Sequence, residues 1–406
     1  MVMEMLFRKL LKSFNISNKL FYIVPALNQG LGIVITVFVI AKMNAESAGE
    51  LAIIASTAAL LLPLFTLRID ILLAHENNIV SVKQFNDILN ILHSITICIF
   101  IFVLILAFLL DYKILQNNFF IASIGAFVMS GYALQYANFV QKSDRESIVN
   151  ARTINLILGI ITLPLVIIKI SPLSVFALQI ARNNTSFFIL SIYNSIKNLR
   201  ETSYLDKIFN LKKHWYRLMQ IWLDYIFNQA TTHIIILYTS LINKEVGGTF
   251  FIIYSAINSL NAIYSRTIGL DFVLLAGKNK SQALKKFLKS QVARVFVVCS
   301  VVSLFTVLLF RLSLLDLAWP DLDKMLIMCT PLAILILIVS SASQYYLMNN
   351  EIGKMLKINI FAGSVKVITF IGIVQWGISI ALAMCIAMIM FYLIHFIFLF
   401  VKIAYD

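Results

Sequence analysis

Basic side chains stand inside long apolar segments of this sequence. Arg182 and Lys366 lie near the middle of two such segments, Arg266 in the inner third of another, and Arg152 close to the end of a fourth. A charge at the centre of a bilayer costs roughly 2.5–3.5 kcal/mol on insertion scales, so it usually faces a cavity or a partner. An arginine needs an anion or several acceptors, whereas a lysine stem can also bend toward an interface. These positions predict an anionic ligand within the membrane.

Amide and hydroxyl side chains form stripes on the same segments. Gln179, Arg182 and Ser186 share one helical face, because residues three and four apart lie above one another on a helix. Such stripes predict a water-accessible cavity, although each amide or hydroxyl could instead bond one helix to another. The candidate substrate-binding amides are Asn28, Gln29, Asn228, Gln229 and Asn258.

Acidic residues lie near the ends of the apolar segments, so the expected cavity is net positive and favours an anion. Arg68 and Asp70 are close enough in sequence to form a local ion pair, as are Arg266 and Asp271. The alternative for these carboxylates is ion coupling. His233 lies mid-segment and could relay protons or simply be hydrogen-bonded. The candidate ion-coupling residues are Asp70, Asp224, Asp271 and His233.

Catalytic motifs are not found in the sequence. It has no P-loop, which argues against an intrinsic ATPase, and no recognisable Ser/His/Asp set. The four cysteines are far apart within apolar runs and have no metal-ligand spacing. We therefore expect a transporter that is not an enzyme and has neither cofactor nor metal.

The composition indicates a membrane protein with little soluble structure. Of 406 residues, 60% are hydrophobic and 13% are charged, whereas a soluble domain is about half apolar and a quarter charged. A spanning helix needs about 20 apolar residues. Apolar runs predict about twelve such helices, at 20–41, 48–67, 88–110, 117–140, 147–168, 172–193, 222–243, 247–269, 291–314, 325–347, 358–375 and 379–401.

The distribution of Lys and Arg predicts the orientation. Most of them fall in alternate loops, which places both termini in the cytoplasm by the positive-inside rule. This rule accounts for the net charge of +14, so a nucleic-acid partner is not required. Residues 1–19 are expected to form a cytoplasmic amphipathic segment, and the basic stretch 194–221 to form an interfacial linker.

An internal repeat relates the two halves of the chain. Asn28-Gln29 recurs as Asn228-Gln229, and a second set of residues recurs at a constant offset of 199. This set comprises Glu46, Gly49, Ile53, Ile54 and Ser56, which recur as Glu245, Gly248, Ile252, Ile253 and Ser255. The offset predicts two parallel six-helix bundles, 20–193 and 222–406. Such halves typically enclose a site at the membrane midplane and exchange access by rocking.

These features resemble a known family. The stretch Leu67-Arg68-Ile69-Asp70-Ile71-Leu72-Leu73-Ala74 resembles the Arg-rich segment of polysaccharide-biosynthesis exporters, and residues 212–276 resemble that family's seventh and eighth spans. With the span count and the repeat, the chain looks like the Wzx-type O-antigen or capsule flippases of the multidrug/oligosaccharidyl-lipid/polysaccharide exporter superfamily. The resemblance implies the all-α, MATE-like exporter architecture.

The resemblance also implies a substrate and a location. The substrate would be an undecaprenyl-pyrophosphate-linked oligosaccharide of lipopolysaccharide or capsule biosynthesis. It would move from the cytoplasmic to the periplasmic leaflet of the bacterial inner membrane by alternating access, with proton or sodium coupling. A polymerase and a chain-length regulator of the glycan pathway would be partners. Arg182 and Lys366 could then face one cavity, with Arg68, Arg152 and Arg266 on the cytoplasmic side where the headgroup loads.

Two alternatives remain open. A MATE-type secondary exporter, such as an antiporter of a drug or another amphiphile, would place carboxylates in the middle of the cavity if its substrate were cationic. A membrane polymerase or ligase of the same glycan pathway would be expected to have a long periplasmic loop with Arg or His.

Overall fold

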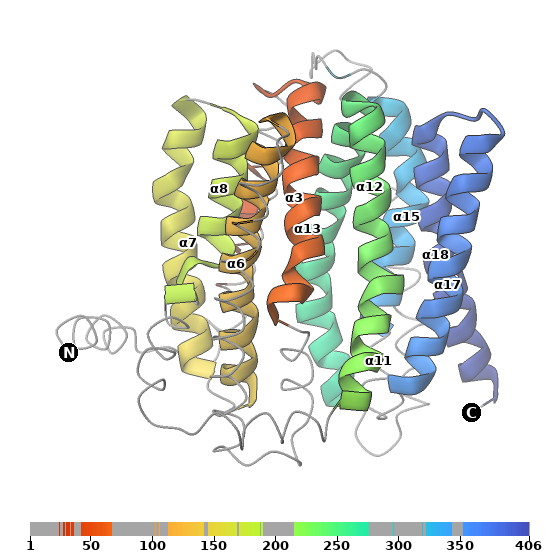
Figure 1. Ribbon diagram of the computed structural model, residues 1–406. Helices are drawn as coiled ribbons and strands as arrows, with labels where there is room; N and C mark the ends of the chain where they lie inside the picture. The colour runs from red at the N-terminus through yellow and green to blue at the C-terminus, as the bar shows by residue number, and fades with distance from the viewer. Residues whose placement is uncertain are drawn as a thin grey trace.

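In the part of the chain that the computed structural model describes, all the regular structure is helical. The model describes residues 45–66, 113–141, 145–168, 170–186, 215–275, 322–342 and 352–405, with single positions elsewhere, mainly between 24 and 44. The helices stand side by side along one direction (Figure 1). They are α3 (Ala45–Thr66), α6 (Lys113–Gln141), α7 (Arg145–Ile168), α8 (Pro172–Asn183), α11 (Trp215–Tyr225), η1 (Ile226–Ala230), α12 (Thr231–Ile242), α13 (Lys244–Leu275), α15 (Leu322–Ala342), α17 (Ile352–Gln375) and α18 (Ile380–Tyr405).

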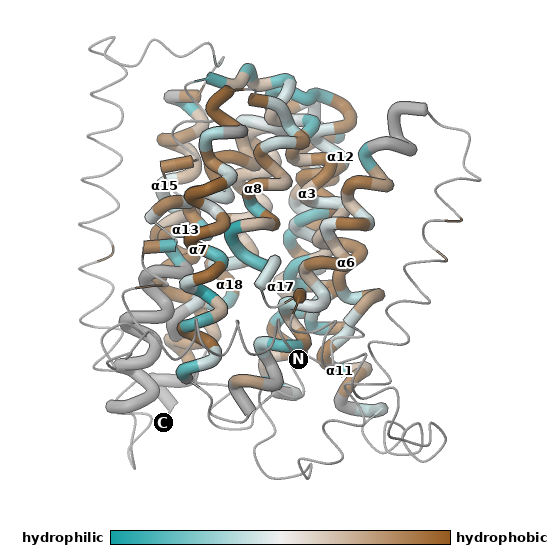
Figure 2. The backbone as a smooth tube through the Cα atoms, turned by 90° about the vertical axis from the view of Figure 1, so that its left-hand side faces the viewer, coloured by the Kyte–Doolittle hydropathy of each residue, from teal (hydrophilic) through white to brown (hydrophobic). Residues whose placement is uncertain are grey.

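The described helices suit a bilayer in both length and composition. Five of them are long and apolar enough to cross a membrane, and a shorter apolar helix covers Lys324–Ser340. Hydrophobic residues, brown in Figure 2, predominate along most of their length. Large apolar side chains such as Ile161, Ile168 and Ile368 are exposed on the outside, where lipid is the natural solvent. Because lipid cannot satisfy backbone polar groups, a helix is the expected form for each span. The chain is a multi-pass membrane protein.

Helix covers nearly all of each expected span that the structure describes continuously. The expected spans 88–110 and 291–314 lie outside the described residues except for single positions, as do segment 1–19 and most of the linker. The number twelve, the two six-helix domains and the side on which the termini lie therefore stay predictions.

Two spans differ in detail from the expected uninterrupted runs. The sixth span begins at a capping box in which the Ser171 hydroxyl accepts from the backbone N–H of Ser174, and α8 ends at Asn183. Asn184 forms a turn before further helical positions. The seventh span starts at Trp215, within the predicted linker, and is continuous from α11 through the π-helix η1 to α12. Leu218 and Ile221 are buried on this early turn, which explains why the helix extends back beyond residue 222.

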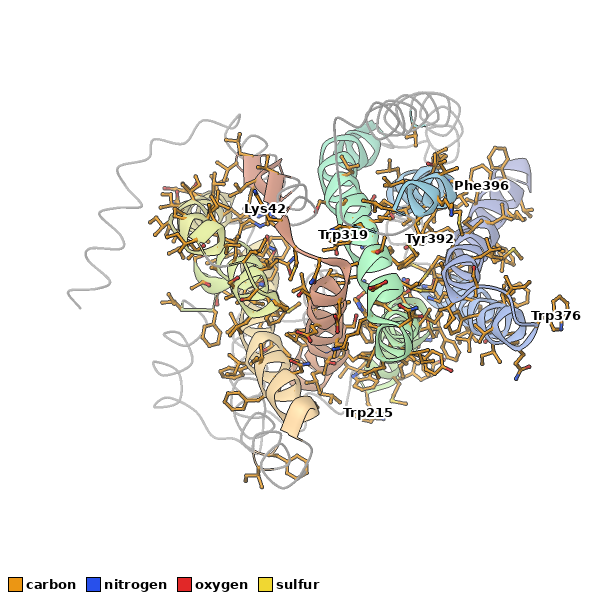
Figure 3. All side chains as sticks on the ribbon, turned by 90° about the horizontal axis from the view of Figure 1, so that it is seen from above. Lys42, Trp215, Trp319, Trp376, Tyr392 and Phe396 are labelled. Carbon is orange, nitrogen blue, oxygen red and sulfur yellow. The ribbon has the colours of Figure 1, made fainter. Side chains whose placement is uncertain are left out.

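The repeat-related helices α3 and α13 pack against each other at the centre of the molecule. In the view from above they lie between α6, α7 and α8 on one side and α12, α15, α17 and α18 on the other (Figure 3). A Cβ on Gly49 would overlap the backbone carbonyl of Lys244, and a Cβ on Gly248 would overlap the carbonyl oxygen of Ala45. Gly49 and Gly248 correspond in the repeat, as do Ala45 and Lys244. The contact is therefore reciprocal, as an axis of two-fold pseudosymmetry requires.

Further contacts join the two halves of the chain at the end of the helices where Gly49 and Gly248 meet. Lys244 pairs with Glu50 at 3.1 Å and with Glu46 at 3.6 Å. The indole N–H of Trp319 donates to the backbone oxygen of Met43 at 2.6 Å. The positive-inside rule predicts that this is the outer end.

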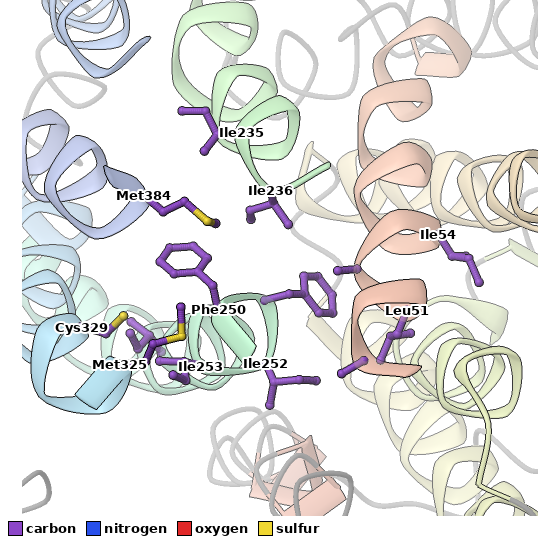
Figure 4. Close-up of a cluster of buried hydrophobic side chains, with 14 of the residues drawn as sticks. Leu51, Ile54, Ile235, Ile236, Phe250, Ile252, Ile253, Met325, Cys329 and Met384 are labelled. Atoms are coloured by element: carbon purple, nitrogen blue, oxygen red, sulfur yellow. The ribbon is translucent and has the colours of Figure 1, made fainter. Parts of the chain in front are cut away.

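A hydrophobic cluster continues this contact inward. In Figure 4, Phe250 and Ile252 of α13 lie on one side of α3, with residues of α12, α15 and α18 beyond them, whereas Leu51 and Ile54 of α3 lie on its side away from α13. Leu51 and Phe250 have no exposed surface. Helices in lipid associate largely through close packing, because the tails are as apolar as the side chains. The small residues at the α3–α13 crossing make that packing possible.

We predict that Gly248→Ala lowers the stability of the protein. The added methyl overlaps backbone atoms of α3, which cannot move aside as a flexible side chain would, and overpacking typically costs about 1–3 kcal/mol. The midpoint of thermal unfolding in detergent should fall. Gly353→Ala on α17 is the matched control, because nothing lies within 4 Å of its Cβ position. An equal midpoint for the two variants would contradict the tight crossing.

Candidate functional site: two adjoining polar cavities

The interior of the molecule contains two polar cavities on either side of α13. One, the arginine cavity, has a volume of about 270 Å³ and is lined by Asn28, Tyr132, Arg152, Arg182, Asn183, Asn184, Asn258 and Ser259. The other, the C-terminal cavity, has a volume of about 320 Å³ and lies among α12, α13, α15, α17 and α18. Asn258 lines both. None of the described residues that line either cavity is acidic.

Arg182 is held rigidly at the arginine cavity. One guanidinium nitrogen donates to the backbone oxygen of Asn28 at 2.6 Å, and the Asn28 amide donates back to the backbone oxygen of Arg182 at 3.3 Å. A Cβ on Gly32 would overlap the guanidinium, and one on Gly159 would lie 3.0 Å from the Arg182 stem. Arg182 therefore occupies a slot between two helices. Its Nε is buried without a partner among the described residues.

Arg152 is the second cation of this cavity. It is 7% exposed, and its guanidinium lies over the ring of Tyr136, 5.2 Å from the centroid. In the part of the chain that the structure describes, no carboxylate pairs with Arg152 or Arg182; the ion pairs shown there join Lys244 to Glu46 and Glu50. Two buried arginines without a counter-ion favour binding of an anion, because an uncompensated buried charge is costly.

Neighbouring polar groups fix the backbone around the arginines. The Asn155 amide of α7 donates to the backbone oxygen of Asn183 at 2.9 Å and accepts from the backbone N–H of Ser186 at 2.9 Å. The Ser186 hydroxyl donates to the backbone oxygen of Ala151 at 2.7 Å. These bonds join α7 to the chain just after α8, where Asn184 interrupts the helix. Ser186 therefore bonds helix to helix and does not line the cavity.

The C-terminal cavity has a different chemistry. Its wall combines amides, imidazoles and phenols with a few apolar groups: Asn228, Gln229, Thr232, His233, Tyr254, Asn258, Asn261, Val339, Ser340, Met355, Asn359, Phe391, Tyr392 and His395. The side chain of Tyr254 interacts with Asn258, Thr232 and Tyr392. The described residues of this wall are polar and aromatic and include no Lys or Arg.

Lys366 lies behind this wall and has no exposed surface. Its ammonium donates to the backbone oxygen of Asn228 at 2.8 Å and to the Thr232 hydroxyl at 2.8 Å. It also lies 4.3 Å from the centroid of the Phe391 ring, a cation–π distance. The structure thus differs from the expectation of one cavity shared by both cations: Arg182 lines one cavity, whereas the ammonium of Lys366 is satisfied by protein groups beside the other.

The Asn228 carbonyl that accepts from Lys366 lies within the π-helix η1. A π-helical turn shifts the backbone hydrogen-bond pattern by one residue and often occurs at functional sites. The hydroxyls of Thr231 and Thr232 also donate to the Asn228 oxygen, at 3.3 and 3.1 Å. Gly363 of α17 lets that helix approach η1, because a Cβ there would overlap the carbonyl of Phe227. Asn28 and Asn228 correspond in the repeat, and each accepts a hydrogen bond from a buried cation.

Sequence comparison finds neither a matching family model nor a matching curated protein. Solved structures are similar in fold. The lipid II flippase MurJ in an inward closed conformation has a TM-score of 0.63 at 16% identity, over 95% of this chain and 90% of that chain. An inward-facing multidrug resistance MATE family transporter of the MOP superfamily has a TM-score of 0.53 at 11% identity, over 98% of both chains. A MATE protein in complex with MaD3S has a TM-score of 0.51 at 13% identity, over 95% and 94%.

The chain has the fold of these flippases and exporters. The all-helical membrane architecture expected from the sequence is confirmed at this level. At such low identities the similarity concerns the fold, and the site must be judged from the geometry above.

Most of the predicted site residues whose side chains the structure describes line the two cavities. Asn28, Arg152 and Arg182 line the arginine cavity, and Asn228, Gln229 and His233 line the C-terminal cavity. Asp224 is not among the described lining residues but lies next to the C-terminal cavity, where it accepts a hydrogen bond from the amide of the wall residue Asn359. Arg266 and Asp271 belong to α13, but their side chains lie outside the described residues, as do Arg68, Asp70 and Gln29.

Several wall residues were not among the predicted site residues. Asn359 is seven residues before Lys366 and so shares its helical face, which was a usable signal. Tyr392 and His395 are three residues apart on α18 and share a face in the same way. Tyr132 has no comparable signal, because it is one tyrosine in a largely apolar segment.

Neither a metal site nor a disulfide is seen among the described residues. No group of three or more His, Cys, Asp or Glu is placed to hold a metal there. Cys329 and Cys385 are free and buried, with their sulfur atoms 3.4 Å apart. This contact joins α15 to α18 as ordinary apolar packing.

Proposed function

We propose that this protein is a flippase for an undecaprenyl-pyrophosphate-linked oligosaccharide, such as an O-antigen or capsule repeat unit. It would move this lipid from the cytoplasmic to the periplasmic leaflet of the bacterial inner membrane. The observation that carries the proposal is the arginine cavity, where Arg152 and Arg182 are buried without a paired carboxylate among the described residues. A pyrophosphate supplies the missing charge, and a guanidinium can hold it through two parallel hydrogen bonds.

The conformation supports loading from the cytoplasm. The Gly49–Gly248 crossing, the Lys244 ion pairs and the Trp319 hydrogen bond join the halves at the outer end. Rocking of one half against the other would open that end. In the proposed cycle, the pyrophosphate binds at Arg182 while the outer end is closed and leaves after the halves have rocked apart. Coupling to protons or sodium is part of this proposal.

A MATE-type exporter of another amphiphile is the second candidate. The similarity to a multidrug resistance transporter over 98% of both chains favours it. The chemistry of the walls bears on its substrate, because the described lining residues include no acidic side chain that would pair with a cationic drug. The substrate of such an exporter would be anionic or neutral.

The test is a flipping assay with purified protein in liposomes. A lipid-linked pyrophosphoryl sugar is incorporated in the membrane, and its appearance in the other leaflet is followed with a membrane-impermeant sugar-modifying enzyme. We expect transfer well above that of protein-free liposomes, and competition by farnesyl pyrophosphate. Transfer at the protein-free rate would contradict the proposal. Efflux of an uncharged amphiphile without any transfer of the lipid would favour the exporter.

A further inference from the structure

Unpartnered polar atoms gather in the C-terminal cavity. They are His233 Nδ1, Asn261 Oδ1, Asn359 Oδ1 and His395 Nε2, each buried without a hydrogen-bond partner among the described residues. All four side chains line this cavity. His395 is 8% exposed and Asn359 is fully buried. Leaving a buried polar group unpaired is unfavourable, so the cavity is built to hold something that makes hydrogen bonds.

The unpartnered atoms specify a neutral ligand with hydroxyl groups. An amide oxygen accepts a hydrogen bond, and an imidazole nitrogen donates or accepts according to its tautomer. A hydroxyl can satisfy either, because it is both donor and acceptor. The nearby ammonium of Lys366 is already engaged by Asn228, Thr232 and the Phe391 ring. The described residues of the wall include no acidic side chain, and the nearby ammonium is already engaged, so this part of the wall favours a neutral ligand.

Aromatic rings also line the C-terminal cavity. Phe391 and Tyr392 of α18 pack edge to face at 5.1 Å, and the Phe391 ring lies 4.8 Å from the His395 ring. Tyr254 of α13 lines the same wall. Rings with polar edges bury apolar surface while keeping hydrogen-bonding groups available. A sugar, with C–H faces and hydroxyl edges, matches both features.

The cavity adjoins the arginine cavity. Asn258 lines both, so a ligand spanning α13 at this residue would place its anionic part near Arg182 and its hydroxyl-rich part near His395. The volume of about 320 Å³ is at the low end of small-molecule pockets, roughly 300–1,000 Å³. This suits a single sugar residue better than a whole oligosaccharide.

We propose that the C-terminal cavity binds one neutral sugar residue of the lipid headgroup, next to the pyrophosphate held at the arginine cavity. The inference rests on the proposed function and deepens it, because it assigns the sugar nearest the pyrophosphate to a separate set of residues. His395, Asn261 and Asn359 bind its hydroxyls, and Asn258 lies between the two groups.

Two probes separate the two binding contributions. Farnesyl pyrophosphate carries the anion and a lipid tail, and its adduct with one N-acetylglucosamine adds a neutral sugar. Affinities for the purified protein in nanodiscs are measured by calorimetry. Two or three hydrogen bonds between neutral groups are worth about a tenfold gain in affinity. We therefore expect the adduct to bind about tenfold more tightly than farnesyl pyrophosphate.

Substitutions in the C-terminal cavity test whether the gain in affinity from the sugar arises there. In His395→Phe and Asn261→Leu the ratio of the two affinities should fall to near one, because the hydrogen-bonding groups are lost. Ile397→Phe is the matched control: it introduces the same residue on the same helix, at a position that is 49% exposed on the outside, and should keep the full ratio. His395→Gln keeps a hydrogen-bonding group and should give an intermediate ratio, which serves if the larger changes prevent folding.

The results that would overturn the sugar site differ from those that would contradict the proposed function. A ratio near one in the unaltered protein means that the cavity holds only water, and an unchanged ratio in His395→Phe, Asn261→Leu and His395→Gln means that the sugar binds elsewhere. Either result overturns the inference. Failure of both probes to bind the unaltered protein contradicts the proposed function itself, as would an unchanged affinity of Arg182→Ala for farnesyl pyrophosphate.

Discussion

Arg182→Ala is expected to reduce the affinity for farnesyl pyrophosphate by roughly 10- to 100-fold, because a hydrogen bond to a charged group contributes about 1.5–3 kcal/mol. Flipping in liposomes and display of surface glycan should fall with it, while the amount of protein in the membrane stays the same. Arg182→Lys should restore part of the affinity, since it keeps the charge but loses the planar fork that matches a phosphate.

The controls must separate binding from packing. Arg182 also bonds to Asn28 and fills the slot beside Gly32 and Gly159, so its loss will lower stability as well. Lys357→Ala removes one positive charge from an exposed position on α17 and should leave the affinity unchanged. If Arg182→Ala lowers the midpoint of thermal unfolding but binds farnesyl pyrophosphate as tightly as the unaltered protein, the arginine cavity is not the pyrophosphate site.

Lys366→Ala is expected to act first on stability. The substitution removes a fully buried side chain, its bonds to Asn228 and Thr232, and its contact with Phe391. Large-to-small substitutions in packed interiors typically cost about 2–5 kcal/mol. The midpoint of thermal unfolding should fall clearly, and less so for Lys366→Met, which keeps the stem. Flipping and glycan display should fall because η1 loses the group that holds its carbonyl.

The affinity for farnesyl pyrophosphate distinguishes two roles of Lys366. The contacts described place it as a positioning residue for η1, so the affinity should fall much less than in Arg182→Ala. A loss of affinity as large as that of Arg182→Ala, with the unfolding midpoint unchanged, would instead place the ammonium at the substrate. That result would require Lys366 to leave its present partners in another conformation of the cycle.

Hydropathy was enough to place most of the helices, because a helix in lipid satisfies its own backbone and needs only a sufficient apolar length. The residues at which the helices begin and end were less predictable from the sequence. The seventh span begins at Trp215 because its early turns bury Leu218 and Ile221 against other helices. The turn at Asn184 depends on bonds between Asn155 and the chain after α8. Such contacts come from residues distant in sequence, which a local pattern does not contain.

The repeat was visible in the sequence, but its physical meaning was not. The match of Gly49 with Gly248 indicated related halves, whereas the structure shows these glycines at the place where the halves touch. Similarly, Asn28 and Asn228 were candidates for their side chains. In the structure, their backbone oxygens accept hydrogen bonds from Arg182 and Lys366. A backbone acceptor leaves no trace in residue type, so sequence patterns alone could not predict this role.

Residue types and their spacing determined that this chain is a helical membrane protein carrying cations and amides at depth, because hydropathy and helical periodicity are local properties. Tertiary packing decided which of those groups meet. It set Arg152 and Arg182 on one cavity, enclosed Lys366 behind the wall of the other, and left Nε2 of His395 without a hydrogen-bond partner among the described residues. Desolvation and pairing of a buried charge depend on atoms contributed by several helices, and only the folded arrangement brings those atoms together.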